Sequence, residues 1–163
     1  MFAMMNFFEY NWHVRDEWLE WCNQLTLEEL LKDRKGGVEN ILYTFFHIID
    51  VEYSWIRGIQ GKDDIVFQFT DYPTLEKMKS LSNKLRTEIA EFLILHLENV
   101  KDDIIHVSWD KENFSVDALL HHIIIHEIHH IGQLSIWARE LGHKPVPTNF
   151  IGRPLKPVHS YLK

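Results

Sequence analysis

The chain has 163 residues, of which 45% are hydrophobic and 13% aromatic, a composition that suits one globular domain with a sizeable core. Its net charge of −7 argues against nucleic acid as the main partner, because an acidic surface repels phosphate groups. No run of about 18 apolar residues occurs, which argues against a membrane span. The single cysteine, Cys22, cannot form an intramolecular disulfide, so we expect a reducing, cytoplasmic location.

The first predicted helix covers residues 5–24, where apolar side chains recur at helical spacing around a single interruption, Arg15. Thr26 followed three residues later by Glu29 is a capping-box pattern. It predicts a short second helix that ends near Gly36.

Three further long helices are predicted at residues 38–60, 74–99 and 115–142. Thr74 and Ser115 are the expected N-cap residues, and Gly61 and Gly142 are the expected stops. No alternating pattern is long enough to predict a sheet, so the fold class is all-α. Four long helices in one domain indicate a four-helix bundle.

Two regions are expected along the chain. Residues 1–142 are expected to form the four-helix bundle, for which the histidines described below predict metal binding. Residues 143–163 are expected to form a Pro-rich, extended C-terminal tail, because four of the five prolines lie there. The tail carries basic residues and no acidic ones, whereas the rest of the chain is acidic. We therefore expect the tail to pack on the bundle.

Residues 126–130 read HEIHH, which contains the HExxH pattern of zinc metalloproteases. On a helix, His126 and His130 lie on the stripe that should face the core. Burying two unpaired imidazoles would cost roughly 1–3 kcal/mol each, and one divalent cation would satisfy both. The other members of the stripe are Leu119, Ile123, Leu134, Trp137 and Leu141.

Spacing alone leaves two candidate ligand pairs. His126 can pair with His122 or with His130, but the three cannot share one ion, because eight residues of helix span about 12 Å. His129 points elsewhere and is interpreted as a surface group or as a partner of a ligand. Imidazoles satisfied by carboxylates or water remain the alternative to a metal pair.

The protease hypothesis fails on its other requirements. A metzincin needs glycine and histidine where Gln133 and Ile136 stand, and the only acidic residue after His130 that could serve a gluzincin is Glu140. Glu127 lies about 100° around the helix from His126, so we expect it to face a neighbouring helix and do not assign it as a catalytic base.

A third ligand must come from another helix, and His47 in the second long helix is the candidate. It lies at the edge of a wide apolar arc, where solvent can reach it. A half-exposed histidine without a ligand role is the competing interpretation. Glu52 lies inside the same arc and is interpreted as a buried acid that binds a ligand ring or a tryptophan, or as a salt-bridge partner.

Three segments resemble the DinB/YfiT-like family of metalloenzymes: EYNWHVRDEW, GGVENILYTFFHIIDVEYSWIRG and LLHHIIIHEIHHIGQLSIWARELG. The resemblance covers about residues 8 to 142. It implies an up-down-down-up four-helix bundle, commonly a homodimer, with His47, His126 and His130 as metal ligands. Ile131 stands where many members have arginine, which is a departure from the family pattern.

The resemblance also implies a class of function. Some relatives are low-molecular-weight-thiol S-transferases or isomerases, so a thiol such as bacillithiol or mycothiol is the expected co-substrate, beside a small-molecule substrate. A metal-dependent hydrolase and a non-catalytic stress-response or ligand-binding module are the alternatives. The imidazole ligand set suits zinc, nickel, iron or copper and does not identify the divalent ion.

Overall fold

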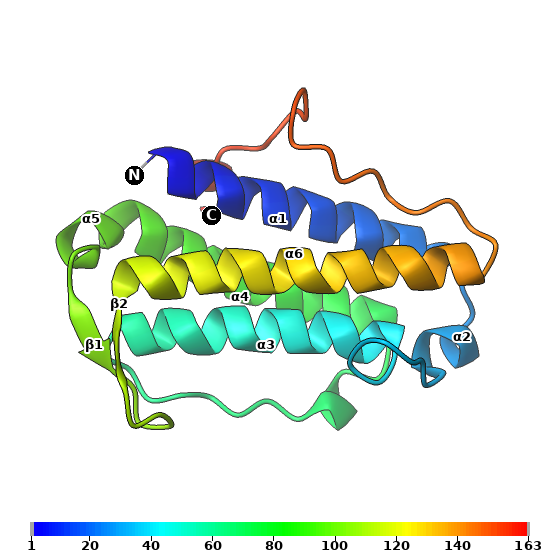
Figure 1. The fold of residues 1–163 in the computed structure, drawn as a ribbon, viewed down its shortest axis with the longest axis horizontal. Helices are drawn as coiled ribbons and strands as arrows, with labels where there is room; N and C mark the ends of the chain where they lie inside the picture. The colour runs from blue at the N-terminus through cyan, green and yellow to red at the C-terminus, as the bar shows by residue number, and fades with distance from the viewer. Residues whose placement is uncertain (1, 163) are drawn as a thin grey trace.

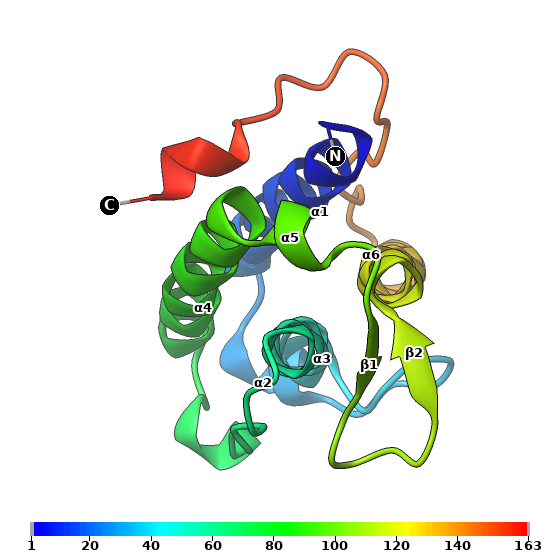
Figure 2. The same ribbon diagram turned by 90° about the vertical axis from the view of Figure 1, so that its left-hand side faces the viewer.

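The computed structural model describes residues 2–162 and is mostly helical (Figure 1). Its four long helices are α1 (Phe2–Trp21), α3 (Ile41–Ile59), α4 (Leu75–Leu95) and α6 (Val116–Glu140). Figure 1 shows α1 and α6 running in one direction and α3 and α4 in the other. In the end-on view of Figure 2, α3 lies between α4 and α6, and α1 lies across from it, so the four helices enclose one core.

Shorter elements connect the long helices. They are the 3-10 turns η1 (Cys22–Gln24), η2 (Phe69–Asp71) and η3 (Val158–Tyr161), the helices α2 (Leu27–Leu31) and α5 (Leu97–Val100), and the strands β1 (Ile104–His106) and β2 (Asn113–Ser115). Within residues 2–162 no helix is both long and apolar enough to cross a membrane.

The predicted helix ends are mostly confirmed. The side chains of Thr26, Thr74 and Ser115 accept the N-cap hydrogen bonds of α2, α4 and α6, and Glu29 completes the capping box. Gly61 and Gly142 have positive φ, as a helix stop requires.

Five predicted boundaries were wrong by a few residues. The first helix already includes Phe2, whereas residue 5 was its predicted start. The short second helix ends at Leu31 and not near Gly36, because Lys32 takes an extended conformation. The second long helix begins after Asn40, whose side chain caps it, and not at residue 38. The first helix gives way to the 3-10 turn at Cys22. The helix predicted at residues 74–99 ends at Leu95, because the backbone of His96 is not helical. The short helix α5 begins after it.

The prediction of an all-α fold was wrong in one detail. Strands β1 and β2 pair in antiparallel register, with Ile105 opposite Phe114. Each strand has three residues, which is too short for an alternating pattern to be recognised. The position of the hairpin depends on a contact with another element, because it packs on α3 at Gly58. A Cβ added at Gly58 would lie 2.7 Å from Val107 Cγ1.

The C-terminal tail crosses α1 and ends against α4 (Figures 1 and 2). Tyr10 Oη donates to the carbonyl of Thr148 at 2.6 Å, and the backbone N–H of Val158 donates to Glu9 at 2.8 Å. Arg153 forms an ion pair with Glu17 at 2.5 Å, so a basic residue of the tail meets an acidic residue of α1.

A buried ion cluster joins three of the long helices. Arg15 of α1 is fully buried and donates to Glu52 of α3 at 2.8 Å and to both carboxylate oxygens of Glu127 of α6, at 2.8 and 2.6 Å. Burial alone would lower the pKa of Arg15, but the two carboxylates outweigh it and raise the pKa above its ordinary value. Trp12 Nε1 also donates to Glu52, at 2.8 Å.

The cluster answers two questions that the sequence left open. Glu52 binds both a tryptophan and an arginine, and no metal-ligand ring. Glu127 faces the neighbouring helix α1, as predicted, and its carboxylate is fully engaged by Arg15.

Replacing Arg15 with methionine should strongly destabilise the fold, because it leaves two buried carboxylates without their cation. We expect Arg15→Met to lower the free energy of unfolding by about 3–5 kcal/mol, measured by urea denaturation at neutral pH. The control is Arg139→Met, since Arg139 is exposed on α6, and its effect should stay within about 0.5 kcal/mol. Equal effects of the two substitutions would contradict this role of Arg15.

Candidate metal centre

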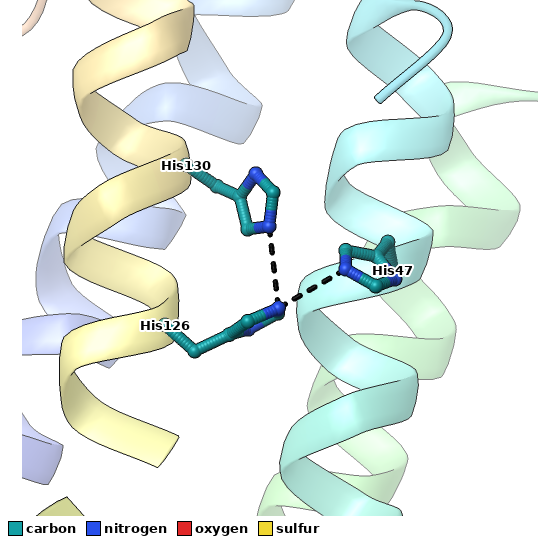
Figure 3. A group of neighbouring side chains, drawn as sticks. All are labelled: His47, His126 and His130. Atoms are coloured by element: carbon teal, nitrogen blue, oxygen red, sulfur yellow. Dashed lines mark hydrogen bonds between the residues drawn. The ribbon is translucent and has the colours of Figure 1, made fainter. Parts of the chain in front are cut away.

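Three histidine side chains meet between α3 and α6 (Figure 3). Nε2 of His126 lies 3.0 Å from Nε2 of His47 and 3.2 Å from Nε2 of His130. One ring nitrogen from each residue falls within 4.8 Å of the other two. Of the two pairs that spacing left open, the structure brings His126 together with His130 and His47.

Helix geometry explains the convergence. His126 and His130 are one turn apart on α6, so their side chains leave the same face. His47 lies on the face of α3 that packs against α6. His130 is buried, whereas His47 and His126 are half-buried. The nitrogen cluster therefore lies at the rim of the core and is partly open to solvent.

Gln133 fixes the orientation of His130. Its side-chain oxygen lies 2.7 Å from Nδ1 of His130, and its Nε2 lies 3.1 Å from Nε2 of His129. An amide oxygen only accepts, so Nδ1 of His130 carries the ring proton and Nε2 keeps its lone pair directed at the cluster. His129 thus extends the hydrogen-bonded chain that runs from His130 through Gln133.

The sequence did not predict this role of Gln133, because there the residue stood out only as a departure from the metzincin pattern. The available signal was its position three residues after His130, on the same face of the helix.

The loop before α3 packs against Gln133 and Trp137 of α6. A Cβ added at Gly37 would lie 2.7 Å from the ring of Trp137 and 3.0 Å from Oε1 of Gln133. Trp137 Nε1 donates to the carbonyl of Lys35 at 2.8 Å, which holds the loop in place. Glycine at position 37 is therefore required by space, and the loop limits the positions that Gln133 can take.

Electrostatics keep the three rings neutral. Burial lowers the pKa of His47, His126 and His130, and repulsion from neighbouring imidazoles lowers it further. The pKa of His126, which is surrounded by other histidines, falls to about 3. Neutral imidazole is the form that binds a metal, so the cluster is ready to act as a ligand set at neutral pH.

The donor set fits a divalent cation. Two nitrogen ligands about 2.1 Å from a tetrahedral ion lie about 3.4 Å apart, close to the separations of 3.0 and 3.2 Å found here. The three nitrogen atoms cannot satisfy one another as hydrogen-bond partners, because His126 Nε2 faces two others and carries at most one proton. A cation would accept all three lone pairs.

Other residues that the sequence singled out lie outside the cluster. His122 is exposed, with its ring centroid 5.8 Å from that of His126. Ile131 is buried and lines a cavity between α6 and α1, so it does not face the three histidines. Cys22 is buried in η1, and burial raises the pKa of its thiol to about 12, which makes it a poor ligand.

The comparisons with known proteins agree with the resemblance seen in the sequence. A sequence model described as the DinB family matches residues 1–155. The chain is also similar to the uncharacterized protein YizA of Bacillus subtilis (strain 168), with 66% identity over 159 residues that cover 97% of this chain and all of the relative.

Removing the hydrogen bond to His130 should weaken metal binding without removing a ligand. We expect Gln133→Leu to lower the affinity for Zn²⁺ about 10- to 100-fold, measured by competition with a chelator of known affinity. His129→Ala removes only the outer group and is the matched control, with a change below about threefold. An affinity unchanged by Gln133→Leu would show that the tautomer of His130 is set in another way.

Proposed function

This chain belongs to the DinB family, and we propose that it is a metal-dependent enzyme in which His47, His126 and His130 hold one divalent cation. The observation that carries the proposal is the convergence of three neutral imidazole nitrogens, from two helices, at a half-buried position. In this proposal the four long helices form the up-down-down-up bundle of the family, and the single, buried Cys22 suits a reducing cytoplasm.

Three protein ligands leave room for a further one. A divalent cation with three imidazole ligands and an open position would lower the pKa of a thiol or of water that reaches it. The exposed sides of His47 and His126 are where such a molecule would arrive. Gln133 would hold the proton of His130 on Nδ1 throughout, which keeps Nε2 free as a ligand.

Transfer of a low-molecular-weight thiol is the reaction that this site suits best. A thiol has an ordinary pKa of about 8.5 and water of about 15.7, so a thiol needs much less help to lose its proton. Hydrolysis usually relies on a carboxylate base beside the ion, as in HExxH enzymes. Here Glu127 points about 100° away from His126 and is engaged by Arg15, so it cannot serve as that base. In the transfer, the sulfur would form a bond to the electrophilic carbon of a small substrate while the leaving group departs with its electron pair.

The metal site is tested first by metal analysis. Untagged protein should contain about one divalent ion per chain. His47→Ala should lower the affinity for the ion by more than roughly 100-fold, which is the largest effect expected from removing a hydrogen-bond partner of a ligand. His122→Ala is the matched control, because His122 is also four residues from His126 but outside the cluster. Unchanged metal content in His47→Ala would remove this residue from the site.

The reaction is tested with the same variants. Metal-loaded protein is incubated with chlorodinitrobenzene and, in turn, cysteine, glutathione, bacillithiol and mycothiol. We expect a conjugate with at least one thiol that depends on the metal and is lost in His47→Ala. If metal binds but no thiol gives a metal-dependent conjugate, transfer is contradicted, and hydrolysis of ester and amide substrates becomes the next assay.

We also propose that the protein is a homodimer. On the outer face of α6, Ile125, Ile128 and Ile136 are 62%, 44% and 58% exposed, a row of apolar side chains along one helix. Ile124, although adjacent to Ile125 in the sequence, is buried and does not belong to this row. A self-complementary helix face is a common basis for a two-fold interface.

A charge in this row should separate the subunits. We expect wild-type protein to have the mass of a dimer by light scattering and Ile125→Asp to have the mass of a monomer, because the carboxylate would be desolvated at the interface. Leu95→Asp, at a 56% exposed position on α4, should remain a dimer. A wild-type monomer at micromolar concentration would contradict the proposal.

A further inference from the structure

Aromatic rings extend in a row from the histidine cluster, on side chains of α6, of α3 and of the β1–β2 hairpin. The ring centroid of His122 lies 5.8 Å from that of His126. The ring centroid of Trp55 lies 5.9 Å from that of His122. Trp109 follows at 5.6 Å from Trp55. Neighbouring rings in this row are thus in contact, and the row begins at one of the proposed metal ligands.

The outer end of the row comes from the β1–β2 hairpin. Trp109 stands in its turn, and Phe114 of β2 lies 5.7 Å from Trp55. The hairpin can approach α3 so closely because position 58 is glycine: an added Cβ would lie 3.1 Å from the ring of Trp109. The glycine therefore allows a tryptophan from a separate segment to lie against Trp55.

The row remains open to solvent. Trp109 is 41% exposed, His122 is exposed, and Trp55 and Phe114 are half-buried. If the hairpin served only to cover α3, burying the indole of Trp109 would give it the largest gain in stability. The hairpin does bury Val107, which is 2% exposed. An exposed tryptophan beside a second tryptophan and an imidazole instead offers ring faces and edges to a flat apolar guest.

We propose that Trp55, Trp109, Phe114 and His122 form a subsite for an aromatic or similarly flat apolar group of the substrate. This group would lie on the rings while the reacting end of the same molecule lies at His47, His126 and His130. The inference rests on the proposed function, because it takes the three histidines as the reacting centre, and it narrows the substrate class from any small electrophile to one with a ring at a distance from the reacting atom.

Hydroxamates test the subsite without catalysis, because they bind metal ions that have an open position. The protein is first loaded with Zn²⁺ and its metal content is measured. Acetohydroxamate is then compared with benzohydroxamate and longer phenylalkyl hydroxamates, by calorimetry and by quenching of tryptophan fluorescence. We expect the best phenyl compound to bind about tenfold or more tightly than acetohydroxamate, as ring contact and burial would give.

The variants separate the subsite from the metal. Trp109→Ala should reduce the tenfold preference to below about threefold, and Trp109→Phe should restore part of it, while the metal content and the affinity for acetohydroxamate stay unchanged. Gly58→Ala, which displaces the hairpin, should also reduce the preference. Leu95→Ala, at an exposed apolar position on α4, is the control and should keep it.

Each outcome bears on a different claim. Equal affinities for acetohydroxamate and the phenyl compounds, or a preference that survives in Trp109→Ala, would overturn the aromatic subsite and leave the metal centre intact. Protein that takes up no metal, or metal-loaded protein that binds no hydroxamate, would overturn the proposed function itself, and the subsite with it.

Discussion

A single guanidinium shared by two buried carboxylates fixes the relative position of the helices that carry the histidines. Arg15 binds Glu52 of α3 and Glu127 of α6 at 2.6–2.8 Å. Glu127 directly follows His126, and Glu52 lies five residues after His47. Because both carboxylates must reach the same cation, α3 and α6 cannot slide or rotate far without leaving a charge unpaired in the core. The separation of the imidazole nitrogens, which lie on another face of α6, depends on that constraint.

The same constraint explains why the HExxH letters do not make a protease here. On a helix, the residue after His126 points about 100° away, and in this fold that direction leads to Arg15. The residues of the pattern have two roles. His126 and His130 form part of the histidine cluster, whereas Glu127 joins α6 to α1 through Arg15. The letters match those of a zincin, whereas the surroundings of the glutamate exclude a role as general base.

The sequence predicted those parts of the structure that depend on neighbours along the chain. The caps at Thr26, Thr74 and Ser115 act within one turn of helix, so they were identified correctly. The grouping of His47 with His126 and His130 came from the family resemblance, because periodicity alone placed His47 only at the edge of an apolar arc. The structure adds contacts over long separations: Arg15 and Glu127 are 112 positions apart, and the β1–β2 hairpin depends on Gly58 of another element. No local pattern encodes such pairs.

The contacts between the two ends of the chain set an order for folding. Glu9 accepts a hydrogen bond from Val158 and Tyr10 donates one to Thr148, across separations of 149 and 138 positions. At about 5–20 residues per second, a ribosome needs roughly 7–30 s to add the intervening residues. During translation, the side of α1 that carries Glu9 and Tyr10 therefore stays exposed to solvent until residues 148–158 have been synthesised.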